Sequence, residues 1–200
     1  FAGYESLETK TKILKYRKVS GKGKELFQLV LENTPFYAES GGQVGDTGTI
    51  TLSAQPGEVS VINIKIINTK KENDLIIHFT DQVPANLAGE VTASVDRNRR
   101  RNITVHHSVT HLMHAALRRI LGTHVAQKGS LVNEEHTRFD FSHFAKMTDQ
   151  ELEAVEETVN EKIRENIPVV IRSMGKEEAI EMGAMALFGE KYADTVRVVI

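Results

Sequence analysis

Two histidines four residues apart, near the middle of this 200-residue chain, have the spacing best suited to chemistry. His107 and His111 lie in a stretch whose apolar spacing predicts a helix through Leu121, and residues at i and i+4 project from one face of a helix. Two imidazoles directed at one place could ligate a metal ion, or they could be ordinary structural residues. A zinc-protease helix is excluded, because that motif needs a glutamate beside the first histidine and this chain has Ser108.

The predicted helix directs its histidines away from its main apolar face. The sequence nevertheless offers fewer ligands than a zinc site needs. Zinc usually takes four protein ligands, or three and a water molecule, and the chain has no cysteine. His114 is about 10 Å from His107 along the helix axis, too far to join the same ion. Nothing in the spacing of His124, His136 and His143 brings them into the site. The predicted polar stripe is His107, His111, His114 and Arg118, and the predicted apolar face is Val109, Met113, Ala116, Leu117 and Ile120.

A glycine-rich stretch, Ser40–Gly48, is the second candidate site. Glycines allow a backbone to approach a ligand closely and leave its amides free, so we interpret Ser40, Gly41 and Gly42 as substrate-binding. Gln43 offers a neutral amide that can hold a polar group without charging the site. The alternative is a wide hairpin loop that turns at Asp46–Gly48.

Arg97, Arg99, Arg100 and Arg101 lie in the first turn of the predicted helix, which Asp96 is placed to cap. Positive charge at this end opposes the helix macrodipole, so these side chains need another source of negative charge. Phosphate groups are the natural candidate, and a solvated surface cluster is the alternative.

Composition limits the class of protein. The formal net charge is −2, which gives no general attraction to nucleic acid, so the local arginine cluster matters more than the sum. No apolar run approaches the roughly 20 residues that span a bilayer, and no signal peptide is recognisable. The absence of cysteine fits a reducing compartment, and we expect a cytoplasmic location.

The pattern of elements predicts an α+β protein with two domains. Residues 1–95 contain short strands separated by turns, which is typical of a small β-barrel. Residues 96–200 are expected to form an α/β-sandwich-like domain, with the long histidine-bearing helix against a mixed or antiparallel sheet. The expected strands are Lys12–Tyr16, Glu25–Leu31, Thr49–Leu52, Val59–Ile67, Leu75–Thr80, Glu90–Val95, Gly129–Val132, Thr137–Phe141, Val169–Arg172 and Thr195–Ile200.

Further signals concern the second domain. Thr148 and Glu151 form a capping box that opens a helix with a predicted core stripe of Leu152, Val155, Val159 and Ile163. A short helix is expected over Glu177–Glu181, and Val169–Arg172 has the apolar composition of a buried strand. The final apolar strand has no polar terminator, from which we expect the natural protein to continue.

Several segments, in order and at compatible spacing, resemble the editing domain of alanyl-tRNA synthetases, and less closely the free-standing proteins related to it. Their number makes the resemblance more specific than any single motif. The amino-terminal match is to the synthetase rather than to the shorter relatives, which predicts a piece of a multidomain enzyme. The matching segments are Phe1–Tyr4, Pro35–Gly48, His107–Leu117, Gln127–Val132, Arg138–His143 and Leu187–Tyr192.

The resemblance implies hydrolysis of the ester that joins a wrong amino acid, serine or glycine, to alanine tRNA, within an ATP-dependent enzyme that ligates alanine to that tRNA. It puts the family's first two zinc ligands at His107 and His111 and its pocket glutamine at Gln43, and we predict these three residues to be catalytic. Two further ligands, in a Cys-x-x-x-His motif, are expected beyond Ile200, so these 200 residues alone are expected to bind zinc weakly or not at all. The implied partners are the acceptor end of alanine tRNA and the other domains of the parent synthetase, with no membrane.

The sequence leaves several roles open. Zinc would either activate water or orient the substrate. We expect Gln43, Ser40 and Thr110 to read the serine hydroxyl, because alanine lies between glycine and serine in size and steric exclusion alone would not reject it. The main alternative is a tRNA-binding module without activity in isolation. A second alternative rests on Gly41-Gly42-Gln43, a tripeptide that also occurs in peptide release factors, which cleave a related ester.

Overall fold

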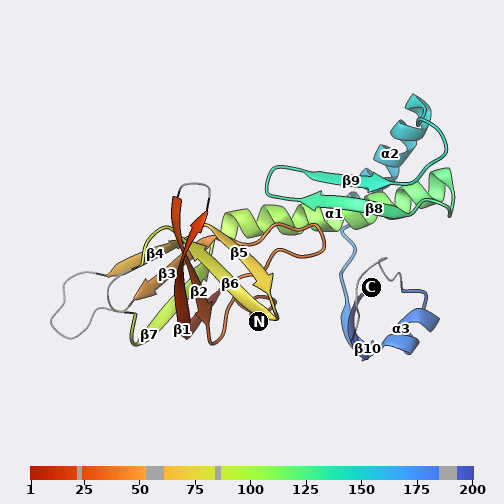
Figure 1. Cartoon of the computed structure of the whole chain (residues 1–200). Coiled ribbons are helices and arrows are strands. Elements are labelled where there is room, and N and C mark those ends of the chain that lie inside the picture. The colour runs from red at the N-terminus through yellow and green to blue at the C-terminus, as the bar shows by residue number, and fades with distance from the viewer. Residues whose placement is uncertain (22–23, 53–60, 84–86, 185–192) are drawn as a thin grey trace. The chain divides into compact units, whose positions relative to one another are not determined.

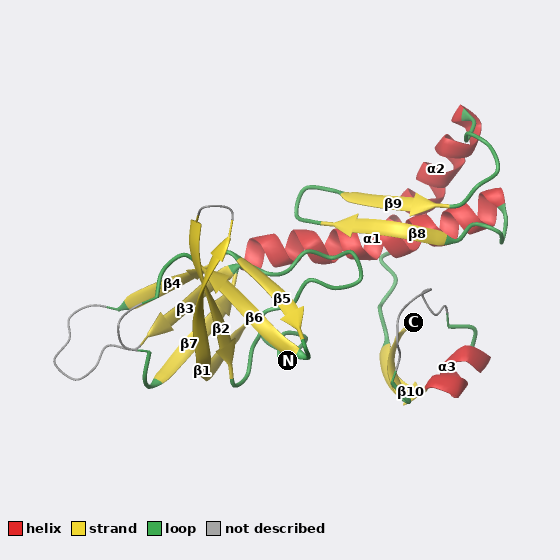
Figure 2. Ribbon diagram, in the orientation of Figure 1, coloured by secondary structure: helices red, strands yellow, loops and turns green. Residues whose placement is uncertain are grey.

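The structure is a computed structural model that describes residues 1–21, 24–52, 61–83, 87–184 and 193–200. It separates into two compact units (Figure 1). The first comprises Phe1–Ser108 with Ser130–Arg138, and the second comprises Val109–Gly129 with Phe139–Ile200. Strands and helices are both present, which confirms the α+β class (Figure 2). The domain boundary at residues 95 and 96 stays a prediction.

The first unit is built on a seven-stranded antiparallel sheet with the order β4-β3-β7-β1-β2-β6-β5. The hairpin predicted in the first thirty residues is confirmed, although its first strand is longer than expected. The strands are β1 (Glu8–Gly21), β2 (Lys24–Leu31), β3 (Gly48–Leu52), β4 (Ile62–Ile66), β5 (Asn68–Glu72), β6 (Leu75–Thr80) and β7 (Glu90–Val95).

The expected closed barrel is not confirmed. The order of hydrogen-bonded strands is open, with β4 at one edge and β5 at the other, and no pairing between these two strands is present in the described part of the chain. The two edge strands are nevertheless consecutive, because only Ile67 separates them, and its amide donates to the carbonyl oxygen of Phe79 on β6 at 2.8 Å. The chain therefore passes directly from one edge of the sheet to the other.

Alternating apolar residues give this sheet one buried face, as in the pattern of β7, where every second residue is buried. The buried cluster includes Leu29, Ile50, Ile66 and Phe36, all 0% exposed. His78 on β6 is also 0% exposed and is held by Thr34 and by the carbonyl oxygen of Leu29. The core thus supports the loop that follows β2.

Helix α1 (Arg97–Leu121) confirms the predicted long helix that bears the histidines. Asp96 caps it, because its Oδ1 atom accepts a hydrogen bond from the amide of Arg99 at 3.0 Å. Gly122 ends the helix with φ = 117°, in the region that favours glycine.

The second unit contains the last part of α1, helix α2 (Asp149–Glu165) and strand segments of the hairpin β8 (Gln127–Val132) and β9 (Thr137–Phe141). Both halves of the predicted capping box at Thr148 and Glu151 are present. Val155 and Val159 are buried against residues of α1, as predicted. Leu152 and Ile163 are about half exposed, so the predicted core stripe of α2 is too wide.

Strands β10 (Ile171–Gly175) and β11 (Thr195–Val199) pair with each other, and α3 (Lys176–Glu181) lies between them in the chain. The prediction of a buried strand here is wrong, because Val169, Val170 and Ile171 are 66%, 44% and 48% exposed. The segment Leu187–Tyr192 lies outside the described residues. No helix in the described ranges is long and apolar enough to cross a membrane.

Candidate functional site

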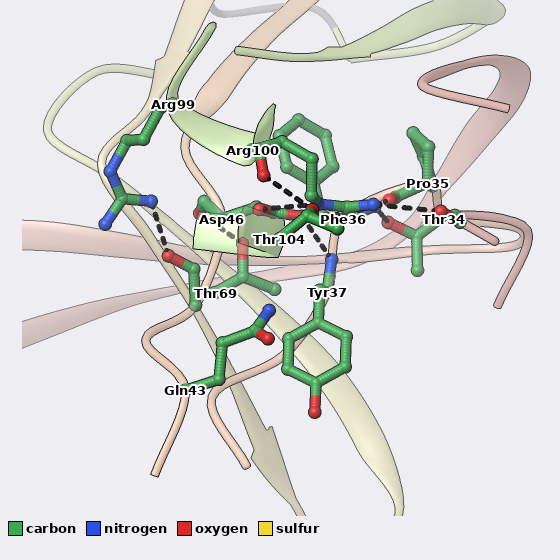
Figure 3. A network of polar contacts seen from close by, with 12 residues as sticks. Thr34, Pro35, Phe36, Tyr37, Gln43, Asp46, Thr69, Arg99, Arg100 and Thr104 are labelled. Atoms are coloured by element: carbon green, nitrogen blue, oxygen red, sulfur yellow. Dashed lines mark hydrogen bonds and ion pairs between the residues drawn. The ribbon is translucent and has the colours of Figure 1, made fainter. Parts of the chain in front are cut away.

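A buried ion pair fixes the start of α1 to the glycine-rich loop (Figure 3). The Nε atom of Arg100 donates to both carboxylate oxygens of Asp46, at 3.1 and 3.0 Å, and Asp46 is only 1% exposed. The remaining guanidinium nitrogens donate to the carbonyl oxygens of Gly3 at 2.9 Å and Pro35 at 3.0 Å. A buried charge is tolerated when it is paired and fully hydrogen-bonded, and Arg100 meets both conditions.

Asp46 also shapes the loop that contains it. Its Oδ2 atom accepts from the amide of Tyr37 at 2.7 Å, and its own amide donates to the carbonyl oxygen of Tyr37 at 2.9 Å. The hydroxyl of Thr69 on β5 donates to the carbonyl oxygen of Asp46 at 2.9 Å. The two arms of the loop are therefore held together and against the sheet.

The other arginines of the first helical turn differ from Arg100. Arg99 donates to the carbonyl oxygen of Gly45 at 2.8 Å and pairs with Glu134 at 3.0 Å. Desolvation raises the pKa of Glu134, but its hydrogen bond with Arg99 helps to bring that pKa below its ordinary value. Arg97 and Arg101 are exposed. For Arg99 and Arg100, carboxylates of the protein itself supply the negative charge that offsets the positive end of the helix dipole. Phosphate is therefore not needed to stabilise these two side chains.

Gly42 and Gly45 serve close packing, and the interpretation of Ser40, Gly41 and Gly42 as substrate-binding stays a prediction. Gly41 and Gly42 have φ values of 59° and 84° and form a two-residue turn, in which the amides and carbonyls of Ser40 and Gln43 bond to each other. A Cβ atom on Gly42 would lie 2.2 Å from Oγ of Ser130, and one on Gly45 would lie 1.9 Å from the carbonyl oxygen of Thr69. Only glycine fits at either position.

This turn brings Gln43 onto α1. The Oε1 atom of Gln43 lies 2.6 Å from Nδ1 of His107, and Gln43 is only 6% exposed. Backbone bonds between Gly42, Val44 and Val132 of β8 hold the turn in place. An amide oxygen can only accept, so in this contact Nδ1 of His107 is the donor, and in the neutral form of the ring the lone pair that can ligate a metal is then on Nε2. This is the arrangement of a metal-ligating histidine whose second nitrogen is bound by a neighbouring acceptor.

The donor set therefore fits half of a zinc site. His111 follows His107 by one turn of α1, and desolvation lowers its pKa below the ordinary value, which favours the neutral ligand form. No group of three His, Cys, Asp or Glu side chains that could hold a metal ion occurs among the residues described. His124 and His143 bond to each other at 2.9 Å.

His114 corrects the predicted stripe, because it is 6% exposed and lies against Phe139 of β9, with ring centroids 5.1 Å apart. Burial and the nearby charge of Arg118 lower its pKa, so it is a neutral core residue. The hairpin covers a second side of α1, which the helical periodicity did not reveal.

The remaining predicted residues have different environments. Ser40 and Gly41 are exposed, whereas Thr110 is buried at 7% exposed. Sequence reasoning missed the roles of Asp46 and Glu134. Asp46 was interpreted only as a turn residue, although an aspartate in an otherwise uncharged glycine loop, combined with four arginines on a helix, is a signal for an ion pair.

Comparison with known proteins identifies related sequences. The family model for class II (A) tRNA synthetases matches residues 1–99. Over all 200 residues the chain is 54% identical to alanine–tRNA ligase from Cytophaga hutchinsonii, and over 201 aligned residues it is 52% identical to that from Christiangramia forsetii. It is also 52% identical over 200 residues to the ligase from Bacteroides fragilis.

Each of these alignments covers 100% of the chain but only 22% of the relative, so the chain spans about a fifth of the length of the curated relatives it matches. Because each alignment runs over the full length of the chain, no part of the chain lies outside the match. The chain belongs to the alanine–tRNA ligase family, as a region of those enzymes.

Proposed function

We propose that this chain carries the editing site of an alanine–tRNA ligase, which hydrolyses the ester of serine or glycine wrongly joined to alanine tRNA. The observation that carries the proposal is the 2.6 Å contact between Gln43 and His107. These residues are far apart in the sequence, and the family resemblance assigns both to one pocket. A buried amide that fixes the tautomer of a helical histidine is a feature of metal sites.

The reaction needs little covalent help from the protein. Hydrolysis adds the oxygen of water to the ester carbonyl carbon, breaks the bond between that carbon and the ribose oxygen, and moves a proton to the ribose oxygen. An aminoacyl ester is an activated acyl group, so orientation and stabilisation of the developing oxyanion supply most of the catalysis. The hydrogen bond that Nδ1 of His107 donates to Oε1 of Gln43 holds the ring of His107 in one orientation.

His107 and His111 would hold zinc, together with the two ligands that the resemblance places beyond Ile200. When bound, zinc would activate water or orient the substrate. With Oε1 committed to His107, the amide NH₂ group is the part of Gln43 that can read a serine hydroxyl. Thr110 is buried and is proposed as a second residue that recognises the serine hydroxyl, whereas Ser40 is exposed.

We propose Arg97 and Arg101 as the contacts to tRNA phosphate. Both are exposed, whereas Arg99 and Arg100 donate to groups of the protein. Ligation of alanine to tRNA is a proposal for the whole enzyme, based on the names of its relatives. Use of ATP, cytoplasmic location and contact with further synthetase domains are proposals that rest on the resemblance described above.

The test uses a full-length alanine–tRNA ligase that contains this sequence. His107→Ala should slow hydrolysis of seryl-tRNA(Ala) by about 100-fold or more, because the metal site loses one ligand. Ser108→Ala is the matched control on the exposed side of the same turn and should retain activity. Alanine charging by each variant serves as an internal control for folding. Normal hydrolysis by the His107 variant would exclude a histidine-centred editing site.

A second candidate function is RNA binding without chemistry. It is favoured by the two exposed arginines, Arg97 and Arg101, in the first turn of α1. The two functions differ in whether free serine is released, because a binding module would retain mischarged tRNA without hydrolysing its ester. Release of free serine that depends on His107 therefore decides between them.

A further inference from the structure

Three aromatic rings form a cluster in the second unit. None of them belongs to the histidines of the proposed metal site. His124 follows α1, and His143 and Phe144 follow β9. The ring centroids of His124 and Phe144 are 4.5 Å apart with an interplanar angle of 24°. Those of His124 and His143 are 5.2 Å apart with an angle of 20°. The ring of His124 therefore stacks on both others, whereas the rings of His143 and Phe144 are tilted by 40° with centroids 6.2 Å apart.

The cluster is exposed where packing alone would favour burial. Phe144 is 87% exposed, the highest value for a large hydrophobic side chain in the described ranges. It is not part of the buried core of the second unit. A phenylalanine ring that stacks on imidazole while one face remains in water is available to an external flat ring.

The polypeptide holds these rings in place. The amide of Ser142 donates to the carbonyl oxygen of Ala126 at 3.0 Å, and the amide of Ala126 donates to Oγ of Ser142 at 3.3 Å. Nε2 of His124 and Nδ1 of His143 are 2.9 Å apart, which joins the two segments by their side chains as well. The cluster is therefore ordered before any ligand arrives, which reduces the entropic cost of binding.

A stacked, exposed ring surface fits a nucleobase. Proteins bind single-stranded RNA by stacking bases on aromatic and histidine rings next to positive charges that contact phosphate. Lys146 is exposed two residues after Phe144, and Arg119 is exposed in the last turn of α1. Paired bases would not fit in this way, because their faces are already stacked within a duplex.

We propose that His124, His143 and Phe144 form a stacking platform for an unpaired base of single-stranded RNA. The choice of RNA over other flat ligands rests on the proposed function, whereas the exposed stack itself does not. A surface that is instead covered by another protein segment is the competing outcome of the test below.

These 200 residues contain four tyrosines and no tryptophan, so Phe144→Trp introduces their single tryptophan into the platform, and its emission is separable from that of the tyrosines. Titration with a six-nucleotide single-stranded RNA should quench its fluorescence at low salt, because a base stacks on the indole. The same RNA annealed to its complement should quench less. Tyr16→Trp, on β1 at a residue that is 62% exposed, is the matched control for collisional quenching and should respond weakly to both.

A second variant separates stacking from simple hydrophobic contact. Phe144→Leu keeps an apolar side chain but removes the ring, and it should weaken binding of dye-labelled single-stranded RNA about tenfold, measured by anisotropy. An unchanged melting temperature is expected, because the residue is exposed. Unquenched fluorescence of the Phe144→Trp variant, or unchanged affinity of the Phe144→Leu variant, would overturn the proposal and favour a protein-covered surface.

The outcome is independent of the hydrolysis test. RNA-dependent quenching in an enzyme that edits without His107 would refute the proposed function and leave the platform standing. Editing that depends on His107, combined with unquenched fluorescence, would refute the platform alone.

Discussion

The side-chain oxygen of Gln43 lies 2.6 Å from Nδ1 of His107, although 64 positions separate the two residues in the sequence. The glycine turn makes this approach possible, because a side chain at position 42 would collide with Ser130. The contact also changes the role expected of Gln43. A residue nominated to read a hydroxyl group also orients a proposed metal ligand.

Removal of this hydrogen bond should weaken zinc binding. In the full-length ligase, Gln43→Leu should lower zinc affinity about 10- to 100-fold, because Nδ1 of His107 loses its acceptor. Competition with a chromophoric chelator measures the affinity directly, without reference to activity. Gln43→Glu is the control, since it retains an acceptor at nearly the same position and should bind zinc more tightly than the leucine variant. Equal zinc affinity in the leucine variant and the wild type would remove Gln43 from the metal site.

Several features of the fold could be predicted from residues close in sequence. The capping box at Thr148 and Glu151, the stop at Gly122 and the alternation along β7 each depend on local chemistry, and the structure contains all of them. Strand β5 was missed because its residues Asn68–Glu72 are mostly polar, which is typical of an edge strand.

Features that depend on distant residues could not be predicted in the same way. The pairing of Arg100 with Asp46 needs the loop after β2 to lie beside the start of α1, and no local pattern gives that arrangement. The burial of His114 depends on Phe139, a residue of another element. For the candidate site, residue types and spacing predicted His107, His111 and Gln43, but not which atoms of them would meet.

The ion pair of Arg100 and Asp46 should be the costliest to break. Asp46→Asn leaves a buried guanidinium without its counter-charge and should lower the free energy of unfolding by about 3–5 kcal/mol. Urea denaturation measures the change. Glu39→Gln is the matched control, since Glu39 pairs with Lys70 at 3.2 Å on the surface, and its loss should cost under about 1 kcal/mol. Similar costs for the two variants would show that burial adds nothing to the Arg100 pair.

His78 should make the protein less stable in mild acid. Burial lowers its pKa from 6.5 to about 4, so between these values the unfolded chain binds a proton that the folded chain does not. Its contribution to stability is therefore complete above pH 6.5 and falls by about 1.4 kcal/mol per pH unit as the pH drops toward 4. His111 and His114, whose pKa values are also lowered, add to the same trend.

The contribution of His78 to this pH dependence is the difference between the stability profiles of the wild type and a His78 variant. His78→Gln should have lower stability at neutral pH and a shallower decline between pH 6.5 and 4, measured by urea denaturation at several pH values. Parallel pH profiles for the variant and the wild type would contradict a depressed pKa at this residue.

The four arginines at the start of α1 should divide into two pairs. Arg97→Gln with Arg101→Gln should weaken tRNA binding and reduce the slope of log affinity against log salt by roughly one unit for each phosphate that no longer pairs with an arginine, with little change in stability. Lys15→Gln with Lys18→Gln, on β1, removes equal charge and should leave the slope unchanged. Arg99→Gln should instead lower stability, because it breaks the pair with Glu134. An unchanged slope in the Arg97 and Arg101 variant would make these residues solvated surface charges.

If Gln43 and His107 act as one hydrolytic site, the effects of substituting them depend on each other, and a double-mutant cycle measures that dependence. The measurement is single-turnover hydrolysis of seryl-tRNA(Ala) by the full-length ligase carrying Gln43→Leu, His107→Ala or both changes. Residues that act as a unit are non-additive, so the double variant should be no slower than His107→Ala alone. Losses that multiply in the double variant would show that the two residues act independently and do not form one hydrolytic site.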